Sequence, residues 1–143
     1  MKTIEIKIPS DPKFSRIVRN SVSHICNVID FSNEQCRTIT LAVDEAVSNI
    51  IQHAYQGDTD KSIIIAFKIQ RDCLEIVLRD FGAKAELDNI KSRELEDVQP
   101  GGLGVHFIKS IMDEVIYDNT LEEGNQLILR KYRTERKNSN VED

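Results

Sequence analysis

The spacing of apolar residues changes between two regular patterns along this chain, and the order of the changes restricts the fold more than any other feature. Apolar and polar residues alternate, as in half-buried strands, at residues 4–8, 63–69 and 74–78, and two more strand-like runs, 115–118 and 125–132, flank Gly124. Apolar residues recur every three or four positions, as in amphipathic helices, at residues 14–29, 36–55 and 105–115. Strands and helices therefore cluster, which predicts an α+β fold: one mixed or antiparallel sheet with helices on one face.

Each helical segment carries a stripe of expected core residues. The first stripe is Phe14, Ile17, Val18, Val22, Ile25 and Ile29. The second is Cys36, Ile39, Val43, Ala46 and Ile50, in a helix ending near Tyr55. The third is Val105, Ile108, Ile111, Met112 and Val115. Ser32 and Gln35 have the spacing of a capping box, so the second helix should begin just after Ser32.

Length and composition fit one globular domain in a reducing compartment. A chain of 143 residues can bury a core, and 40% hydrophobic with 30% charged residues is an ordinary globular composition. We expect one domain over residues 1–132 and a charged, flexible tail at 133–143. The absence of a leader-like or membrane-spanning stretch, with three widely spaced cysteines, favours a cytoplasmic protein with free thiols. The net charge of -5 argues against nucleic acid as the main partner.

Three polar residues lie beside the apolar stripe of the second helix. Glu45, Asn49 and His53 are four residues apart, so they should stack along one helix face at the edge of the core. A solvated helix rim would explain this pattern. The alternative is a metal and proton site, in which the Asn49 amide oxygen binds a hard cation such as Mg²⁺ and Glu45 accepts a proton from a hydroxyl or water. His53 would then orient the site or simply close the helix.

Asp80-Phe81-Gly82 directly follows a predicted strand. It fits either a strand-ending turn or a carboxylate at the edge of a binding site, with Gly82 allowing an unusual backbone conformation. Protein kinases also contain Asp-Phe-Gly, but this chain lacks their glycine-rich loop and their His-Arg-Asp segment, which excludes that reading.

Four of the six glycines lie between residues 81 and 104, a stretch long enough to form a functional lid. Gly101-Gly102-Leu103-Gly104 opens the third helix, where unpaired N–H groups and the helix dipole favour phosphate. A flexible loop leading into the helix is the alternative. Neither a P-loop nor a Rossmann fingerprint is present, so a nucleotide pocket here would be of another kind.

In this order the motifs resemble the GHKL ATPase/kinase superfamily and, within it, the bacterial anti-sigma-factor serine/threonine kinases. LAVDEAVSNIIQHAY (residues 41–55) is similar to that family's N-box, and DFG (80–82) to its first glycine box. GGLGVHFIKSIMDEVIY (101–117) resembles the second glycine box, and EGNQLILRK (123–131) the closing strand. The resemblance covers roughly residues 3–132 and implies a Bergerat-type, histidine-kinase-like ATPase sandwich with a mixed sheet.

The resemblance implies roles for these residues. Asp80 would accept a hydrogen bond from the adenine amino group, Gly82 would shape that pocket, and Asn125 would lie beside Asp80. Asn49 would bind Mg²⁺ that bridges the phosphates, and Glu45 would be the general base on a serine or threonine hydroxyl. The full implied nucleotide-binding set is Asn49, His53, Asp80, Gly82, Gly101, Gly102, Leu103, Gly104 and Asn125.

The resemblance also implies an activity and partners. A protein of this family would bind ATP and Mg²⁺, sequester a sigma factor and phosphorylate a small anti-sigma antagonist protein. It would form a homodimer and have no nucleic-acid or membrane partner. After Gly82 the family often has a Pro-Phe-Asp-like segment, whereas residues 83–86 here are Ala-Lys-Ala-Glu. This departure motivates an alternative, a catalytically inactive nucleotide-binding anti-sigma or protein-interaction module. A stand-alone ATPase is a third reading. A sensor histidine kinase does not fit, because the residues after His24 do not match a phosphoacceptor helix.

Overall fold

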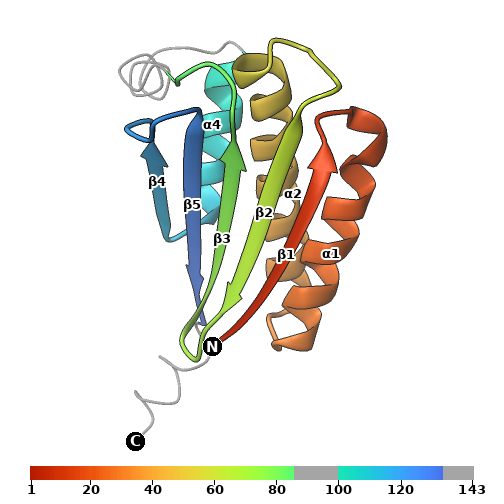
Figure 1. Ribbon diagram of the computed structural model, residues 1–143. Coiled ribbons are helices and arrows are strands. Elements are labelled where there is room, and N and C mark those ends of the chain that lie inside the picture. The colour runs from red at the N-terminus through yellow and green to blue at the C-terminus, as the bar shows by residue number, and fades with distance from the viewer. Residues whose placement is uncertain (86–99, 134–143) are drawn as a thin grey trace, which may run out of the picture.

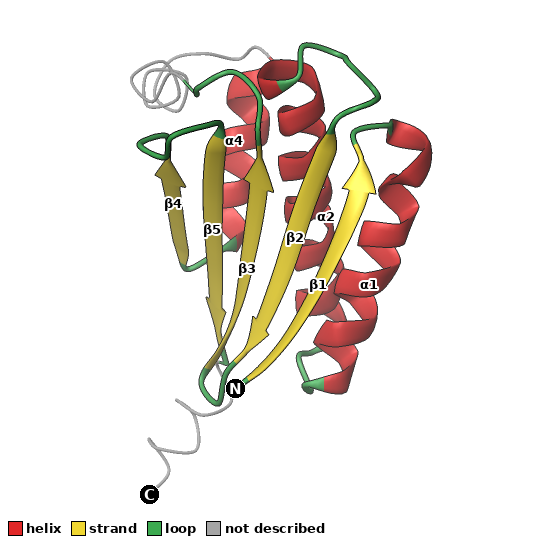
Figure 2. Ribbon diagram, viewed as in Figure 1, coloured by secondary structure: helices red, strands yellow, loops and turns green. Residues whose placement is uncertain are grey.

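One sheet and three α-helices make up the part of the chain that the computed structural model describes, residues 1–85 and 100–133. The strands are β1 (Lys2–Pro9), β2 (Ser62–Ile69), β3 (Cys73–Asp80), β4 (Glu114–Asp118) and β5 (Asn125–Tyr132). The helices are α1 (Ser15–Val28), α2 (Asn33–Asn49) and α4 (Pro100–Ile111). A short 3-10 turn (Pro12–Phe14) precedes α1, and a π turn (Ile50–Ala54) extends α2. All three helices cover the same face of the sheet, which confirms the predicted two-layer α+β sandwich (Figures 1 and 2).

The strands are ordered β1-β2-β3-β5-β4, and every pairing among them is antiparallel. The predicted strands at residues 63–69 and 74–78 are β2 and β3, which pair with each other as a hairpin. The sheet is therefore antiparallel and not mixed. Strands β3 and β4, which α4 connects, do run parallel, but β5 lies between them and pairs with both. The crossover consequently produces no parallel pair.

The core lies between the helices and the inner sheet face, and the second helical stripe is confirmed in full. Its members Cys36, Ile39, Val43, Ala46 and Ile50 are all buried. The capping box at the start of α2 is also present, because the Ser32 hydroxyl accepts from the Gln35 N–H and the Gln35 side chain accepts from the Ser32 N–H. The three cysteines are buried and free. No helix in the described ranges is long and apolar enough to cross a membrane.

Two of the predicted stripes need correction. Phe14 and Ile17 are 41% and 51% exposed. Phe14 belongs to the 3-10 turn before α1, and Ile17 lies one helical step away from the buried line through Val18 and Val22. Val115 belongs to β4 and not to the third helix, since α4 ends at Ile111. The predicted tail (apart from residue 133) and residues 86–99 of the predicted lid lie outside the described residues.

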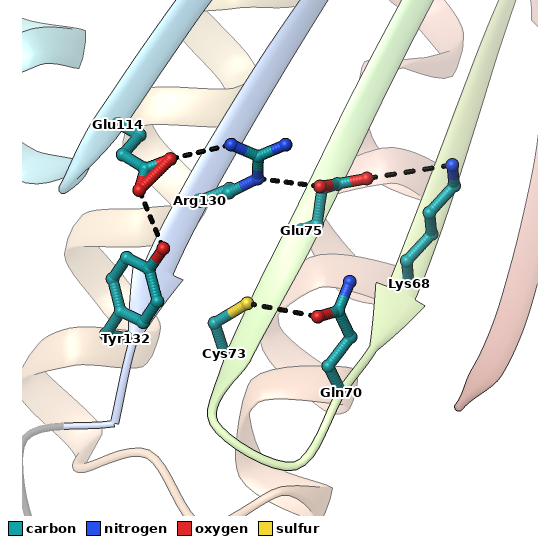
Figure 3. A network of polar contacts seen from close by, with 7 residues as sticks. All are labelled: Lys68, Gln70, Cys73, Glu75, Glu114, Arg130 and Tyr132. Atoms are coloured by element: carbon teal, nitrogen blue, oxygen red, sulfur yellow. Dashed lines mark hydrogen bonds and ion pairs between the residues drawn. The ribbon is translucent and has the colours of Figure 1, made fainter.

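The outer sheet face carries a row of paired polar side chains near one end (Figure 3). The Arg130 guanidinium donates to Glu75 and to Glu114, both at 2.7 Å. Glu75 also pairs with Lys68 at 3.6 Å, and Glu114 accepts from the Tyr132 hydroxyl at 2.6 Å. The row joins four strands and ties β4, the strand that follows α4, to the rest of the sheet.

Candidate functional site

The candidate residues come from elements that meet at one end of the sandwich. The C-terminal end of α2, the end of β3, the start of β5 and the start of α4 lie together at the top of Figure 1. The antiparallel order explains this, because chain reversals bring the end of one strand beside the start of its neighbour. Motifs far apart in the chain thereby reach a single edge.

Asp80 is the last residue of β3 and is only 3% exposed. Its Oδ1 accepts from the Gly82 N–H and from the Asn125 amide, both at 3.0 Å. Asn125 stands directly opposite Asp80 in the β3–β5 register. Within the described residues no hydrogen bond reaches Oδ2, so a nearly buried carboxylate keeps one oxygen for another donor. Burial of a charge without partners is costly, which makes this acceptor a candidate for ligand binding.

The Asn125 side chain holds the segment after Asp80. Its Nδ2 donates to the Asp80 carboxylate and to the Ala83 carbonyl at 2.8 Å, and its Oδ1 accepts from the Ala85 N–H at 2.7 Å. Asn119 adds a bond to the Ala85 carbonyl at 2.9 Å. Both Asn125 amide protons are engaged within the protein, so this side chain has no donor left for another group. The segment that departs from the family pattern is firmly attached as far as Ala85.

Gly82 is required for a different reason from the one predicted. Its φ is not in the left-handed region. Instead, a Cβ at this position would lie 2.2 Å from the Ala54 carbonyl oxygen and 2.6 Å from its carbon. The neighbouring Ala83 N–H donates to the same Ala54 oxygen at 2.8 Å. Gly82 therefore allows the turn after β3 to pack closely against the end of the π turn that extends α2.

Glu45 and Asn49 are half-buried on one flank of α2. The preceding residue, Asp44, pairs with Arg19 of α1 at 3.0 Å, which identifies the α1 side of the helix. One helical step of about 100° carries Glu45 away from that side, and Asn49 follows it one turn later, toward α4. Neither side chain has a hydrogen bond or ion pair within residues 1–85 and 100–133. Two polar groups beside a core helix are thus left for a ligand.

His53 does not continue this line. It lies in the π turn, where the Tyr55 N–H donates to the Ile50 carbonyl, five residues back, at 3.0 Å. The wider turn rotates His53 out of the register that relates Glu45 to Asn49. Its side chain is exposed. The structure therefore groups Glu45 with Asn49 but leaves His53 outside the pair.

Residues 101–104 lie in the first turns of α4, which begins at Pro100, so they open this helix as predicted. Only the backbone is described here, so the Leu103 side chain lies outside the description. The first N–H groups of a helix have no partner within it. Since α4 packs beside α2, its start lies at the same end of the sandwich as the C-terminal end of α2 (Figure 1).

Sequence reasoning missed two residues that shape this edge. The Arg79 guanidinium donates to the carbonyls of Asp80, Asn125 (3.0 Å) and Glu123 (2.6 Å), joining the ends of β3 and β5. Gly124 has φ 71°, and a Cβ there would lie 2.1 Å from the Asp80 carbonyl oxygen. The sequence marks Gly124 only as a turn residue, and nothing local distinguishes Arg79 from other strand arginines.

Known proteins resemble this chain in sequence. Residues 8–131 match the family model of the histidine kinase-like ATPase domain. A protein of Oceanobacillus iheyensis named serine-protein kinase RsbW is 31% identical over 140 residues, covering 92% of this chain and 87% of that relative. A serine-protein kinase RsbW of Bacillus subtilis is 28% identical over 137 residues, covering 90% and 84%.

Solved structures share the fold. The RsbU and RsbW domains of a Mycobacterium tuberculosis protein align with a TM-score of 0.67 at 16% identity, covering 92% of this chain and 32% of that chain. A blue-light activated histidine kinase of Erythrobacter litoralis aligns with a TM-score of 0.59 at 16% identity, covering 91% and 43%. This chain spans less than half of either solved chain, and the likeness at these identities concerns the fold alone.

Proposed function

The chain belongs to the histidine kinase-like ATPase family, and from this premise we propose that it binds ATP with Mg²⁺ and phosphorylates a serine or threonine of a protein. The observation that carries the proposal is the set of unused polar groups at one edge. Glu45, Asn49 and one oxygen of Asp80 have no partners within the described residues, although all three lie beside a packed core. A strand-ending turn, the alternative for Asp80, accounts for the bond from the Gly82 N–H to Oδ1 but not for the Oδ2 of this nearly buried carboxylate, which has no donor within the described residues.

Asp80 supports recognition of the adenine base. Its free Oδ2 suits a hydrogen bond from an exocyclic amino group, while Oδ1 is held by the Gly82 N–H and by Asn125. A carboxylate that is fixed by two donors and then receives a third is well placed to select one base. Asn125 and Gly82 act here as supports of Asp80.

Asn49 supports the metal side of the site. Magnesium prefers oxygen ligands and usually keeps waters and substrate phosphates in its coordination shell, so one protein oxygen can suffice. Within the described ranges no group of three or more His, Cys, Asp or Glu side chains could hold a metal. Bound magnesium would neutralise phosphate charge. We propose that the first turn of α4, residues 101–104, meets the phosphates through its backbone N–H groups, with Gly101, Gly102 and Gly104 allowing close approach.

Glu45 is the proposed general base. It lies one turn before Asn49 on the same flank of α2, so a hydroxyl directed at the terminal phosphate would come near its carboxylate. Glu45 would accept the proton of that serine or threonine hydroxyl as its oxygen bonds to phosphorus and ADP leaves. His53, exposed beyond the π turn, is proposed only as a peripheral contact of the nucleotide.

We further propose that the protein binds a sigma factor, phosphorylates a small anti-sigma antagonist protein, and works as a homodimer in the cytoplasm. The motif resemblance and the similarity to serine-protein kinases support these partners. The free cysteines support a reducing compartment.

Calorimetry of Mg²⁺–ATP binding tests the pocket. Asn49→Ala and Asp80→Asn should each weaken binding, the first with a reduced dependence on Mg²⁺ and the second with a reduced preference for adenine. The exposed His24→Ala variant, on the far end of α1, is the matched control and should bind as the wild type does. Absence of ATP binding by the wild-type protein would refute the proposed function.

Transfer of labelled phosphate to the purified antagonist protein tests catalysis. Glu45→Gln should bind ATP normally and lose most transfer, because the amide cannot accept the hydroxyl proton. Unchanged transfer would refute Glu45 as the base. If the wild type binds ATP and the sigma factor but never labels the antagonist, the protein is instead the catalytically inactive binding module.

A further inference from the structure

Tyr55 connects the two sides of the proposed site, the metal side at Asn49 and the adenine-base side at Asp80. It directly follows the π turn and is 7% exposed. Its hydroxyl donates to the Ser62 carbonyl, at the start of β2, at 2.5 Å. The same hydroxyl accepts from the Phe81 N–H, one residue after Asp80, at 2.8 Å. A single side chain thus joins the end of α2 to two strands.

The turn after β3 depends on these contacts. Within the described residues, the Phe81 N–H bond to Tyr55 and the Ala83 N–H bond to the Ala54 carbonyl attach the turn to the end of the π turn, where Gly82 also approaches closely, while Asn125 of β5 holds the same turn from the sheet. The turn also borders an open cavity of about 490 Å³, which Tyr55, Phe81 and Gly82 help to line. Beside this open cavity, the hydrogen bonds from Phe81 and Ala83 connect the turn to Tyr55 and Ala54.

We propose that Tyr55 is a positioning residue of the nucleotide site, which holds the Asp80 turn at a set distance from Asn49 across the π turn. This inference rests on the proposed function. Asn49 immediately precedes the π turn and Tyr55 immediately follows it, so one short segment connects the metal side of the site to the residue that holds the base side. Loss of the hydroxyl would release the base side and leave the metal side intact.

The chemistry requires a hydroxyl that both donates and accepts. A phenylalanine ring has the same shape but does neither, so Tyr55→Phe leaves the Phe81 N–H without its acceptor. Burial raises the pKa of Tyr55 above its usual value. The hydroxyl therefore keeps its proton at neutral and mildly alkaline pH, and the bond to Ser62 persists there.

The ratio of ATP to GTP affinity tests the inference. Guanine carries a carbonyl oxygen where adenine carries its amino group, so a firmly held Asp80 carboxylate rejects GTP. We expect Tyr55→Phe to lower the ATP-to-GTP affinity ratio about tenfold, equivalent to about 1.4 kcal/mol. Its affinity for Mg²⁺–tripolyphosphate, which lacks a base, should stay at the wild-type value. General destabilisation of the fold would not separate these ligands.

Tyr132→Phe is the matched control. It loses one tyrosine hydroxyl bond, to Glu114 at 2.6 Å, on the outer sheet face away from the site. This variant should keep the wild-type ATP-to-GTP ratio. An unchanged ratio in Tyr55→Phe, with wild-type preference for ATP intact, overturns the role of Tyr55 alone. Absence of ATP binding or of base preference in the wild type overturns the proposed base pocket itself.

A measurement on the wild-type protein covers the case in which Tyr55→Phe fails to fold. ATP should slow hydrogen exchange at the Phe81 N–H more than Mg²⁺–tripolyphosphate does, because only ATP engages the Asp80 turn that this bond anchors. Equal protection by the two ligands would overturn the inference.

Discussion

Replacing Gly82 with alanine would push a methyl group into the backbone at the end of α2. The new Cβ would lie 2.2 Å from the Ala54 oxygen, 2.6 Å from the Ala54 carbon and 2.9 Å from Tyr55 Cδ1. Nonbonded carbon atoms prefer about 3.5–4.0 Å, so the turn must retreat by roughly 1 Å. Overpacking of this kind costs about 1–3 kcal/mol. The retreat also breaks the 2.8 Å bond from the Ala83 N–H, which adds about 1 kcal/mol.

We therefore expect Gly82→Ala to lower the free energy of unfolding by about 2–4 kcal/mol. Urea denaturation followed by circular dichroism measures this as a lower midpoint at an unchanged m-value. Gly57 supplies the matched control, because it has φ 84° and a Cβ added there would have no atom within 4 Å. Gly57→Ala should lower the free energy of unfolding by about 1–2 kcal/mol, which is the cost of placing a side chain on a left-handed backbone. It should leave ATP binding unchanged.

Gly124 combines both penalties, with φ 71° and a Cβ position 2.1 Å from the Asp80 oxygen. Gly124→Ala should therefore be the most destabilising of the three variants. A loss smaller for Gly82→Ala than for Gly57→Ala would refute the close-approach explanation of Gly82, and with it the attachment of the Asp80 turn to α2.

Three further predictions concern other parts of the chain. Hydrogen bonds from Tyr132 and Arg130 lower the pKa of Glu114, so its charge stabilises the fold above the pKa of an unfolded glutamate and this contribution disappears as the pH falls through the folded pKa. Glu114→Gln should thus flatten the acid side of the stability curve in urea titrations, and an unchanged acid slope would contradict this. Asn125→Ala should lower the free energy of unfolding by about 2–3 kcal/mol, because three hydrogen bonds are lost. Calorimetry should also show weaker ATP binding. A variant as stable as the wild type would contradict this prediction. Ser32→Ala should cost about 1 kcal/mol in thermal or urea unfolding by removing the helix cap, without changing ATP affinity.

Much of the fold was predictable because its signals are local. The capping box at Ser32 needs only neighbouring residues, and the α2 stripe from Cys36 to Ile50 needs only the helical period. The predictions were wrong where burial depends on packing between segments far apart in the chain, which a local pattern does not show. Ile17 fits a helical stripe, yet the sheet covers a different side of α1, so its side chain faces solvent.

The arrangement of the candidate site residues was also predictable only in part. The pairing of Glu45 with Asn49 on one flank follows from four-residue spacing in a regular helix. His53 follows the same spacing but departs from the line, because the π turn widens the backbone between Asn49 and Tyr55. No pattern in the residues themselves distinguishes a π turn from an α-helical one here.

What the sequence alone determined is the set of elements and the order in which polar motifs follow them, since periodicity and capping act over a few residues. Tertiary structure alone decided that β5 lies between β3 and β4, which puts Asn125 opposite Asp80. It also decided that the turn at Gly82 meets Ala54 and that the Tyr55 hydroxyl reaches Phe81. Strand order and register depend on contacts between residues far apart in the chain. These contacts stabilise the fold only once the sheet has packed against its helices, so no short stretch of sequence specifies them.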